Sequence, residues 1–340
     1  MYYNNITLKI SIFEVEKWEE DFLKKSLGNS DELSFFNHPL TIADLGAIKD
    51  AEVIVVFIYS SVTKEIIDAL PNLKFIATMS TGFDHIDLAA CKEKHILVSN
   101  VSGYGEITVA EHTFTLLLAL SHRLIESYER VKEGYFSPEG LTGFDLSGKT
   151  LGVVGVGSIG THVIEIAHGF NMNVLGYKRN PDPELEKRFN FKIVDLPTLY
   201  AQSDIISLHV PYTKETHHMI NEETLSQMKD NVVLINTARG PLIDTTAVIK
   251  YLDNGKLRGL GLDVCENEPM LREEKQILSK EFNKEDLLCL LEEKMLLNYK
   301  NVIITPHNAF NSKEALELIL QTTVNNISGF ISNSPQNTVS

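Results

Sequence analysis

The sequence is poor in cysteine and tryptophan and has no long hydrophobic run. It holds 340 residues, among them three cysteines and one tryptophan. The longest apolar run, Thr113–Leu120, is far shorter than the roughly 20 residues that cross a bilayer, so we expect no membrane association. Cys91, Cys265 and Cys289 are scattered without CxxC spacing, which favours reduced thiols over a disulfide framework. The start, MYYNNITLKI, lacks a basic segment followed by an apolar core, so we predict a cytoplasmic protein without a secretory signal.

Basic residues are also scarce. Lys and Arg number 31 against 46 Asp and Glu, a formal net charge of −15. An acidic surface repels phosphate backbones, which argues against nucleic acid as a partner. It also means that any small anionic ligand needs cations placed locally. The hydrophobic fraction of 43% and charged fraction of 23% exclude a disordered or fibrous chain, and the length suits about two domains.

Short apolar runs alternate with helix-length amphipathic segments, a pattern typical of βα units and parallel sheets. The sequence therefore predicts an α/β protein. One long helix is expected over residues 108–132, and one or two surface helices in the charge-dense segment 270–300. The expected strands cover residues 8–13, 53–59, 74–79 and 96–99, then 150–155, 172–177, 204–210, 231–236, 257–264 and 301–305.

A string that matches the Walker A motif, Gly143 to Gly148-Lys149-Thr150, suggests an NTPase. That loop must follow a strand and open a helix, so that backbone amides meet the phosphates. Here Lys149 and Thr150 lead directly into an apolar strand. We therefore do not expect a phosphate loop at this position.

A second glycine motif has the right context. Gly155, Gly157 and Gly160 end a strand and open a helical run. In a dinucleotide-binding βαβ unit such glycines supply the tight turn, the close approach to pyrophosphate and the helix–strand packing. The pyrophosphate is expected at the helix N-terminus near Ser158 and Ile159. The alternative is a glycine turn with a purely structural role.

The end of the next strand indicates the cofactor. NAD sites place an acidic residue there, about 20 residues on, to bind the ribose 2′-hydroxyl. This sequence has Lys178 and Arg179 instead. Two cations favour a 2′-phosphate, so the sequence predicts NAD(P) binding with NADP favoured. The alternative is a solvated cationic strand end.

Three chemically versatile side chains follow successive strands: Arg239, Glu268 and His307. The carboxyl ends of parallel strands share one edge, so these residues are expected at a common crevice. A guanidinium binds a carboxylate bidentately and polarises the adjacent carbonyl. A histidine can protonate the forming alkoxide, and a neighbouring Glu favours its charged form. The set predicts hydride transfer to a 2-keto acid. Taken singly, each residue also has an ordinary structural interpretation.

These motifs resemble the D-isomer-specific 2-hydroxyacid dehydrogenases over residues 50–325. The matching segments are STGFDHIDLAA, VAEHTFTLLLAL, GVVGVGSIG, SDIISLHVP, INTARGPLID, GLDVCENEP and NVIITPH. The resemblance implies two doubly wound parallel-sheet domains, Rossmann-like and flavodoxin-like. Residues 1–101 with 306–340 are expected to form a discontinuous substrate domain, and residues 102–305 the nucleotide domain, with His307 at the hinge.

The resemblance also assigns further site residues. Thr81 and Gly82 are expected to offer backbone amides to the substrate carboxylate. Other residues are expected beside the cofactor, namely His209, Val210, Pro211, Thr237, Ala238 and Asp263, together with Arg239 and His307. Tyr104 and Phe310 resemble pocket residues of the D-lactate dehydrogenase branch, although ordinary packing is the alternative.

The expected activity is reduction of a small 2-keto acid to the D-2-hydroxy acid by NAD(P)H. The 108–132 helix resembles the dimer contact of the family, so a homodimer is expected. Two alternatives remain open. One is a related enzyme, such as a glyoxylate/hydroxypyruvate reductase or a 3-phosphoglycerate dehydrogenase. The other is a nucleotide-sensing protein that resembles the corepressors of this fold. No metal site is expected, because His217 and His218 are adjacent and no HExxH string occurs.

Overall fold

The chain forms two units, and the backbone passes between them twice. In this computed structural model, which describes residues 8–28, 32–266 and 284–339, one unit comprises Met1–Tyr104 with Ser312–Ser340. The other is the continuous stretch Gly105–Asn311. His307 groups with the second unit. No helix in the described ranges has the length and apolar character needed to span a membrane.

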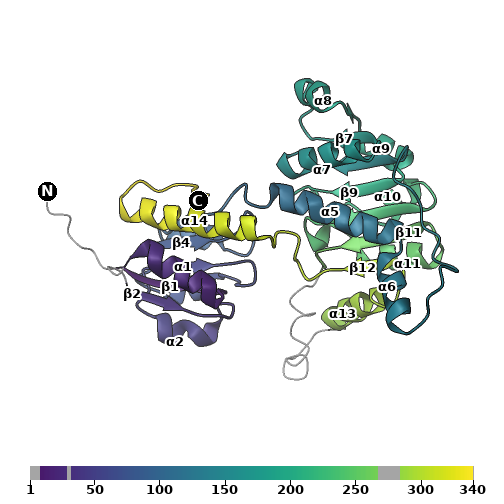
Figure 1. The fold of residues 1–340 in the computed structure, drawn as a ribbon. Coiled ribbons are helices and arrows are strands. Elements are labelled where there is room, and N and C mark those ends of the chain that lie inside the picture. The colour runs from purple at the N-terminus through teal and green to yellow at the C-terminus, as the bar shows by residue number, and fades with distance from the viewer. Residues whose placement is uncertain (1–7, 29–31, 267–283, 340) are drawn as a thin grey trace. The chain divides into compact units, whose positions relative to one another are not determined.

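The first unit is a five-stranded parallel sheet in the order β2-β1-β3-β4-β5, a flavodoxin-like order. Helices α1 and α14 pack together on one face, and α14 also contacts β4 (Figure 1). The other face buries an apolar cluster with residues from α2, α3 and α4. The strands are β1 (Lys9–Ile12), β2 (Glu32–Phe35), β3 (Val53–Val56), β4 (Phe75–Thr78) and β5 (Leu97–Ser99). The helices are α1 (Lys17–Leu27), η1 (Ile42–Asp44), α2 (Leu45–Ile48), α3 (Lys64–Ala69), α4 (Leu88–Glu93) and α14 (Lys313–Ile331).

The second unit is a seven-stranded parallel sheet in the order β12-β11-β10-β9-β6-β7-β8. Its strand order reverses between β6 and β9, the switch point at which doubly wound sheets bind ligands. The strands are β6 (Thr150–Val154), β7 (Asn173–Tyr177), β8 (Lys192–Ile193), β9 (Ile205–Leu208), β10 (Val232–Asn236), β11 (Leu257–Leu262) and β12 (Val302–Ile304). The helices are α5 (Glu106–Ser121), α6 (Leu124–Lys132), α7 (Ser158–Gly169), α8 (Pro183–Phe189), α9 (Leu196–Gln202), α10 (Glu222–Gln227), η2 (Gly240–Leu242), α11 (Thr245–Asp253) and α13 (Lys284–Leu296).

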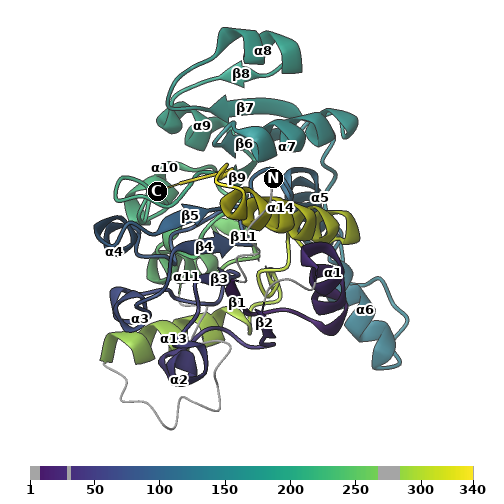
Figure 2. The same cartoon turned by 90° about the vertical axis from the view of Figure 1, so that its left-hand side faces the viewer.

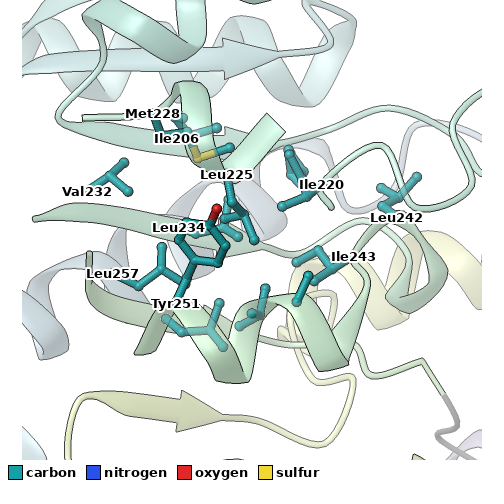
Figure 3. Close-up of a cluster of buried hydrophobic side chains, with 14 of the residues drawn as sticks. Ile206, Ile220, Leu225, Met228, Val232, Leu234, Leu242, Ile243, Tyr251 and Leu257 are labelled. Carbon is teal, nitrogen blue, oxygen red and sulfur yellow. The ribbon is translucent and has the colours of Figure 1, made fainter. Parts of the chain in front are cut away.

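Two apolar cores cover the faces of this sheet. One packs α5 and α7 against β6 and β7 and includes Phe114 and Val163. The other packs α9, α10 and α11 against β9 and β10 (Figures 2 and 3). In Figure 3, Ile220 and Ile243 lie beside Leu242. Since Leu242 closes the short η2 turn that begins after Arg239, this core fixes the position of that turn.

The fold confirms the predicted α/β class with two parallel sheets and corrects one local expectation. The single helix expected over 108–132 is two helices, because Arg123 adopts a left-handed conformation (φ 51°) between α5 and α6. The freed carbonyl of Ser121 accepts a hydrogen bond from the amide of Phe144 at 2.9 Å. Gly143 makes this contact possible, since a Cβ there would lie 2.0 Å from the same carbonyl oxygen.

Three further features bear on the sequence expectations. The strands β2 and β8 were not among those expected. The Walker-like string ends at the start of β6 and opens no helix, in agreement with its rejection. In the charge-dense segment the structure has helix α13, while Glu268 and residues 270–283 lie outside the described residues.

Candidate active site

The glycine motif forms the turn from β6 into α7. Gly155 has φ 104°, a conformation that L side chains rarely adopt, and an added Cβ would lie 2.6 Å from the carbonyl oxygen of His209. A Cβ on Gly160 would lie 2.3 Å from the carbonyl oxygen of Gly155, so the helix packs directly on the turn. Gly157 faces open space and caps α7 without a side chain, ahead of Ser158 and Ile159. This cradle fits a dinucleotide pyrophosphate.

The end of β7 is attached to that turn. The carbonyl oxygen of Tyr177 accepts hydrogen bonds from the amides of Gly155 at 3.0 Å and Val156 at 3.1 Å. Lys178, half-buried, and Arg179, exposed, follow directly. The next carboxylate along the chain, Asp182, caps α8 by accepting from the amide of Leu185 at 3.3 Å. Lys178 therefore occupies the strand-end position at which an NAD site carries its acid.

The segment after β9 lies against the glycine turn. The Nδ1 atom of His209 is buried, and desolvation of the imidazole lowers its pKa to about 3, so the ring is neutral. Its Nε2 lies 2.7 Å from the Ser207 hydroxyl. A Cβ on Gly155 would also touch the Val210 side chain at 2.8 Å. The structure thus places His209 and Val210, with Pro211 next in the chain, beside the predicted pyrophosphate site.

The turn after β10 carries Arg239. Asn236, buried at the strand end, accepts a hydrogen bond from the amide of Ala238 at 3.0 Å and donates to the carbonyl oxygen of Arg239 at 2.8 Å. The Thr237 hydroxyl lies 3.0 Å from the Thr113 hydroxyl of α5, and this hydrogen bond holds Thr237 in place. Asn236 therefore shapes the turn that presents Arg239.

The loop after β11 packs directly on this turn. A Cβ on Gly240 would lie 1.8 Å from the carbonyl oxygen of Cys265, so only glycine fits there. The Glu266 carboxylate links the loop after β11 to the start of α11 and to the segment after β9, accepting from Thr245 at 2.9 Å and lying 2.5 Å from Nε2 of His218. Glu268, two residues further on, lies outside the described residues.

The loop after β12 carries His307. Three consecutive amides bind Asp263: that of His307 donates to the Asp263 main-chain oxygen, and those of Asn308 and Ala309 donate to its two carboxylate oxygens, all at 2.8 Å. His307 has φ 51°, and its ring lies edge-on to that of Phe310 with centroids 6.4 Å apart. Asp263 thus fixes the backbone that presents His307.

The remaining predicted residues belong to the first unit. Thr81 and Gly82 follow β4, where the Thr81 hydroxyl donates to the carbonyl oxygen of Val101 at 2.9 Å and Asn100 donates to the Thr81 carbonyl at 2.8 Å. Ser80 donates to the carbonyl oxygen of Gly82 at 2.6 Å. These bonds engage the oxygens of the turn. Tyr104 is half-buried at the last position of this part of the unit.

The structure adds residues that sequence reasoning missed. His112 and Thr113 on α5 contact the strand-end loops, and Thr305 lies between His112 and Asp263. The signal for His112 is a half-buried histidine directly before the apolar run of α5, where an unpaired polar side chain would be costly. His218, considered only as a metal ligand, instead pairs with Glu266.

Comparisons with known proteins agree with this geometry. The family profile "D-isomer specific 2-hydroxyacid dehydrogenase, NAD binding domain" matches residues 114–309. The D-lactate dehydrogenase of Escherichia coli (strain K12) is 36% identical over 326 residues, which cover 94% of this chain and 96% of that protein. The glyoxylate reductase of Thermococcus litoralis is 37% identical over 293 residues, 84% of this chain and 82% of that protein.

A solved structure extends the likeness to the whole fold. The D-lactate dehydrogenase from Aquifex aeolicus, complexed with NAD and lactic acid, is similar with a TM-score of 0.86 and 40% identity, covering 96% of each chain. The sheet topology, the glycine cradle and these similarities agree. The chain therefore belongs to the D-isomer-specific 2-hydroxyacid dehydrogenase family and is a nicotinamide-dinucleotide-dependent oxidoreductase.

Proposed function

We propose that the protein reduces a small 2-keto acid to the D-2-hydroxy acid with NAD(P)H. The observation that carries the proposal is the placement of Arg239 and His307 at the carboxyl ends of β10 and β12. The same edge of the same parallel sheet bears the glycine cradle after β6. One edge of one unit therefore carries a partner for a substrate carboxylate, a proton donor and a cradle for a dinucleotide.

In this mechanism the guanidinium of Arg239 binds the substrate carboxylate and polarises the adjacent carbonyl. His307 donates a proton to the carbonyl oxygen, and Glu268 supports His307 in this role. The backbone amides of Thr81 and Gly82 also bind the carboxylate. When bound, the dinucleotide would supply the hydride that reduces the carbonyl carbon. Thr237, Ala238 and Asp263 would hold its nicotinamide.

We propose that NADPH is preferred over NADH. The glycine turn and the end of β7 share the Tyr177 carbonyl, so a ribose bound at this turn lies next to Lys178 and Arg179. A Lys or Arg pairs with a 2′-phosphate through charge-assisted hydrogen bonds. Asp182, which could favour the free hydroxyl, is engaged at the start of α8.

Pyruvate is the substrate we favour, since Phe310 lies edge-on to His307 and, together with Tyr104, is proposed to limit the pocket to a short side chain. The similarity to a glyoxylate reductase supports a second candidate, the still smaller glyoxylate. The two differ by a methyl group, for which an apolar pocket discriminates by about 10–200-fold. Relative kcat/KM values therefore separate them.

We further propose a cytoplasmic homodimer. Helix α6 and the loop after it expose large apolar side chains, with Phe136 94% and Tyr135 67% exposed. The others are Leu124, Ile125, Tyr128 and Val131. A hollow of about 910 Å³ beside α6 is lined by both signs of charge, including Arg123, Arg130, Glu126 and Glu129. A surface that carries both signs can pair with a second copy of itself. The free thiol of Cys91 suits a reducing compartment.

The test is a panel of pyruvate, glyoxylate, hydroxypyruvate and 2-ketoisocaproate, each with NADH and NADPH, with the chirality of the product determined. We expect the highest kcat/KM with pyruvate and NADPH and a D-configured product. A preference for glyoxylate or hydroxypyruvate would select the reductase alternative. Absence of turnover across the panel, with dinucleotide binding retained, would favour a nucleotide-sensing protein.

A further inference from the structure

Helix α5 contacts the strand-end loops through two adjacent residues. Nε2 of His112 lies 3.0 Å from the Thr305 hydroxyl and 3.4 Å from Oδ1 of Asp263. The next residue, Thr113, lies 3.0 Å from the Thr237 hydroxyl. One turn of α5 therefore contacts the loops after β10, β11 and β12. These are the loops that carry Arg239, Glu268 and His307.

The direction of the hydrogen bonds follows from proton counting. Thr305 has one hydroxyl proton, and it donates that proton to Oδ1 of Asp263 at 2.5 Å. The bond between His112 and Thr305 must then be donated by the Nε2–H of His112. His112 thus supplies the first proton of a chain that ends on the Asp263 carboxylate. Only a side chain with a donor at this position can complete it.

Asp263 is the acceptor at the centre of this chain. Its side chain is fully buried. Burial raises the pKa of Asp263. Hydrogen bonds from His112, Thr305 and the amides of Asn308 and Ala309 lower the pKa by more than burial raises it, so the net shift is downward. The carboxylate stays ionised because these donors surround it. A buried charge of this kind is costly when a donor is removed.

We propose that His112 is a positioning residue for the acid His307, acting through Thr305 and Asp263; as a role in catalysis, this rests on the function proposed above. His112 supports the carboxylate that holds the amides following His307. It acts at a distance, since the atoms it contacts belong to Thr305 and Asp263. Loss of its donor leaves the buried carboxylate under-satisfied, and the His307 loop loosens.

The test compares His112→Ala with His112→Gln, whose amide also offers an N–H donor. His122→Ala is the matched control, because His122 is an exposed histidine at the C-terminal end of the same helix. The hydrogen bonds from the amides of residues 307–309 to Asp263 are called the anchor here. Hydrogen exchange of the protein without substrate reports on this anchor directly. We expect faster exchange in residues 303–311 of His112→Ala, with α11 (Thr245–Asp253) unchanged. His112→Gln and His122→Ala are expected to exchange like the wild type.

The kinetic arm uses the keto acid with the highest turnover. We expect kcat of His112→Ala to fall by about tenfold or more with KM changed less than threefold, since a small misplacement of a catalytic group costs about this much or more. His112→Gln is expected to stay within about threefold of the wild type. A structural defect unrelated to the anchor would not be rescued by Gln and would raise exchange throughout the unit.

Wild-type exchange and kcat in His112→Ala would overturn the proposal, as would a His112→Gln variant as impaired as His112→Ala. If His112→Ala does not fold, Thr305→Val and Thr305→Ser break and retain the next link of the same chain. Thr305→Val must then loosen residues 303–311, and Thr305→Ser must not; equal exchange in the two would also overturn it. Should no keto acid be reduced, the proposed function fails while the exchange arm still tests the anchor.

Discussion

The main-chain amide of His307 donates a hydrogen bond to the main-chain oxygen of Asp263 at 2.8 Å. With the next two amides bound to the Asp263 carboxylate, the loop that carries the imidazole is held through its backbone. This anchor offsets the roughly 1–2 kcal/mol that a left-handed conformation costs a residue with a Cβ. Replacement of the His307 side chain is therefore expected to leave the loop in place.

His307→Asn is expected to lower kcat by at least about 100-fold, the low end for general acid–base catalysis. Asparagine tolerates the left-handed conformation, so the backbone is preserved while the proton donor is lost. Steady-state kinetics and dinucleotide binding by fluorescence titration check this together. We expect binding within a few-fold of the wild type, and near-wild-type turnover in His122→Asn. Turnover close to the wild type in His307→Asn would contradict the assignment of His307.

Lys178→Asp is expected to reverse the cofactor preference. The substitution removes a partner of the 2′-phosphate and places a carboxylate where NAD sites bind the free hydroxyl. The ratio of kcat/KM for NADPH to that for NADH should fall at least about tenfold, because hydrogen bonds to charged groups contribute about 1.5–3 kcal/mol. Both constants are measured at a saturating keto acid.

Lys187→Asp serves as the matched control for the cofactor prediction, since Lys187 is an exposed lysine in α8. It makes the same change in net charge away from the end of β7. In Lys187→Asp the ratio of kcat/KM for NADPH to that for NADH should stay near that of the wild type. A similar fall in both variants would indicate a long-range charge effect, and an unchanged ratio in Lys178→Asp would refute the role of Lys178.

His209 is expected to make stability depend on pH between neutrality and mild acid. Its pKa in the folded protein is lowered to about 3 from the ordinary 6.5, so between these values the unfolded chain binds a proton that the native chain does not. Stability is therefore full above about pH 6.5 and falls as the pH decreases. From pH 7 to 5 the loss is about 2 kcal/mol.

Urea unfolding at pH 7 and pH 5 measures this loss in the wild type and in His209→Asn. The variant is less stable at pH 7, but its free energy of unfolding should decrease less on acidification. The informative quantity is the difference between the two slopes, which is independent of the general cost of the substitution. Equal slopes would show that the buried imidazole is not the titrating group.

The double substitution Tyr135→Ser with Phe136→Ser is expected to shift the homodimer to monomer. Both side chains are exposed in the single chain, so their removal costs the monomer little, while an interface loses two large aromatic groups. Light scattering at micromolar concentration gives the mass. The control Ile42→Ser removes an exposed apolar residue of the first unit. A monomeric wild type, or a dimer that survives the double substitution, would contradict the proposed interface.

The sequence was sufficient to predict the fold class and most strands, because buried parallel strands appear as runs of β-branched residues, as in β10 and β3. It missed β2, whose alternating exposed and half-buried residues at a sheet edge give a weak signal. From the sequence, α5 and α6 were also predicted as a single helix. Their apolar pattern is continuous, and the break depends on the distant Gly143.

The candidate site also contains residues that the sequence predicts and residues that it does not. The glycine motif and Arg239 could be found because their chemistry is local to a strand end. His112 could not, since its partners Asp263 and Thr305 lie more than 150 residues away in the sequence. Nothing in the residues near His112 in the sequence indicates what it contacts. Only the pairing of β11 with β12 brings these partners together.

The placement of Gly105–Asn311 as one continuous insert between two parts of the first unit has a consequence for protein engineering. The glycine cradle, Lys178, Arg239 and His307 all lie on this insert, while Thr81, Gly82 and Tyr104 lie outside it. Only two junctions need to be joined to exchange the insert between relatives. Cofactor preference and the acid would then be inherited together from one parent, and Thr81, Gly82 and Tyr104 from the other.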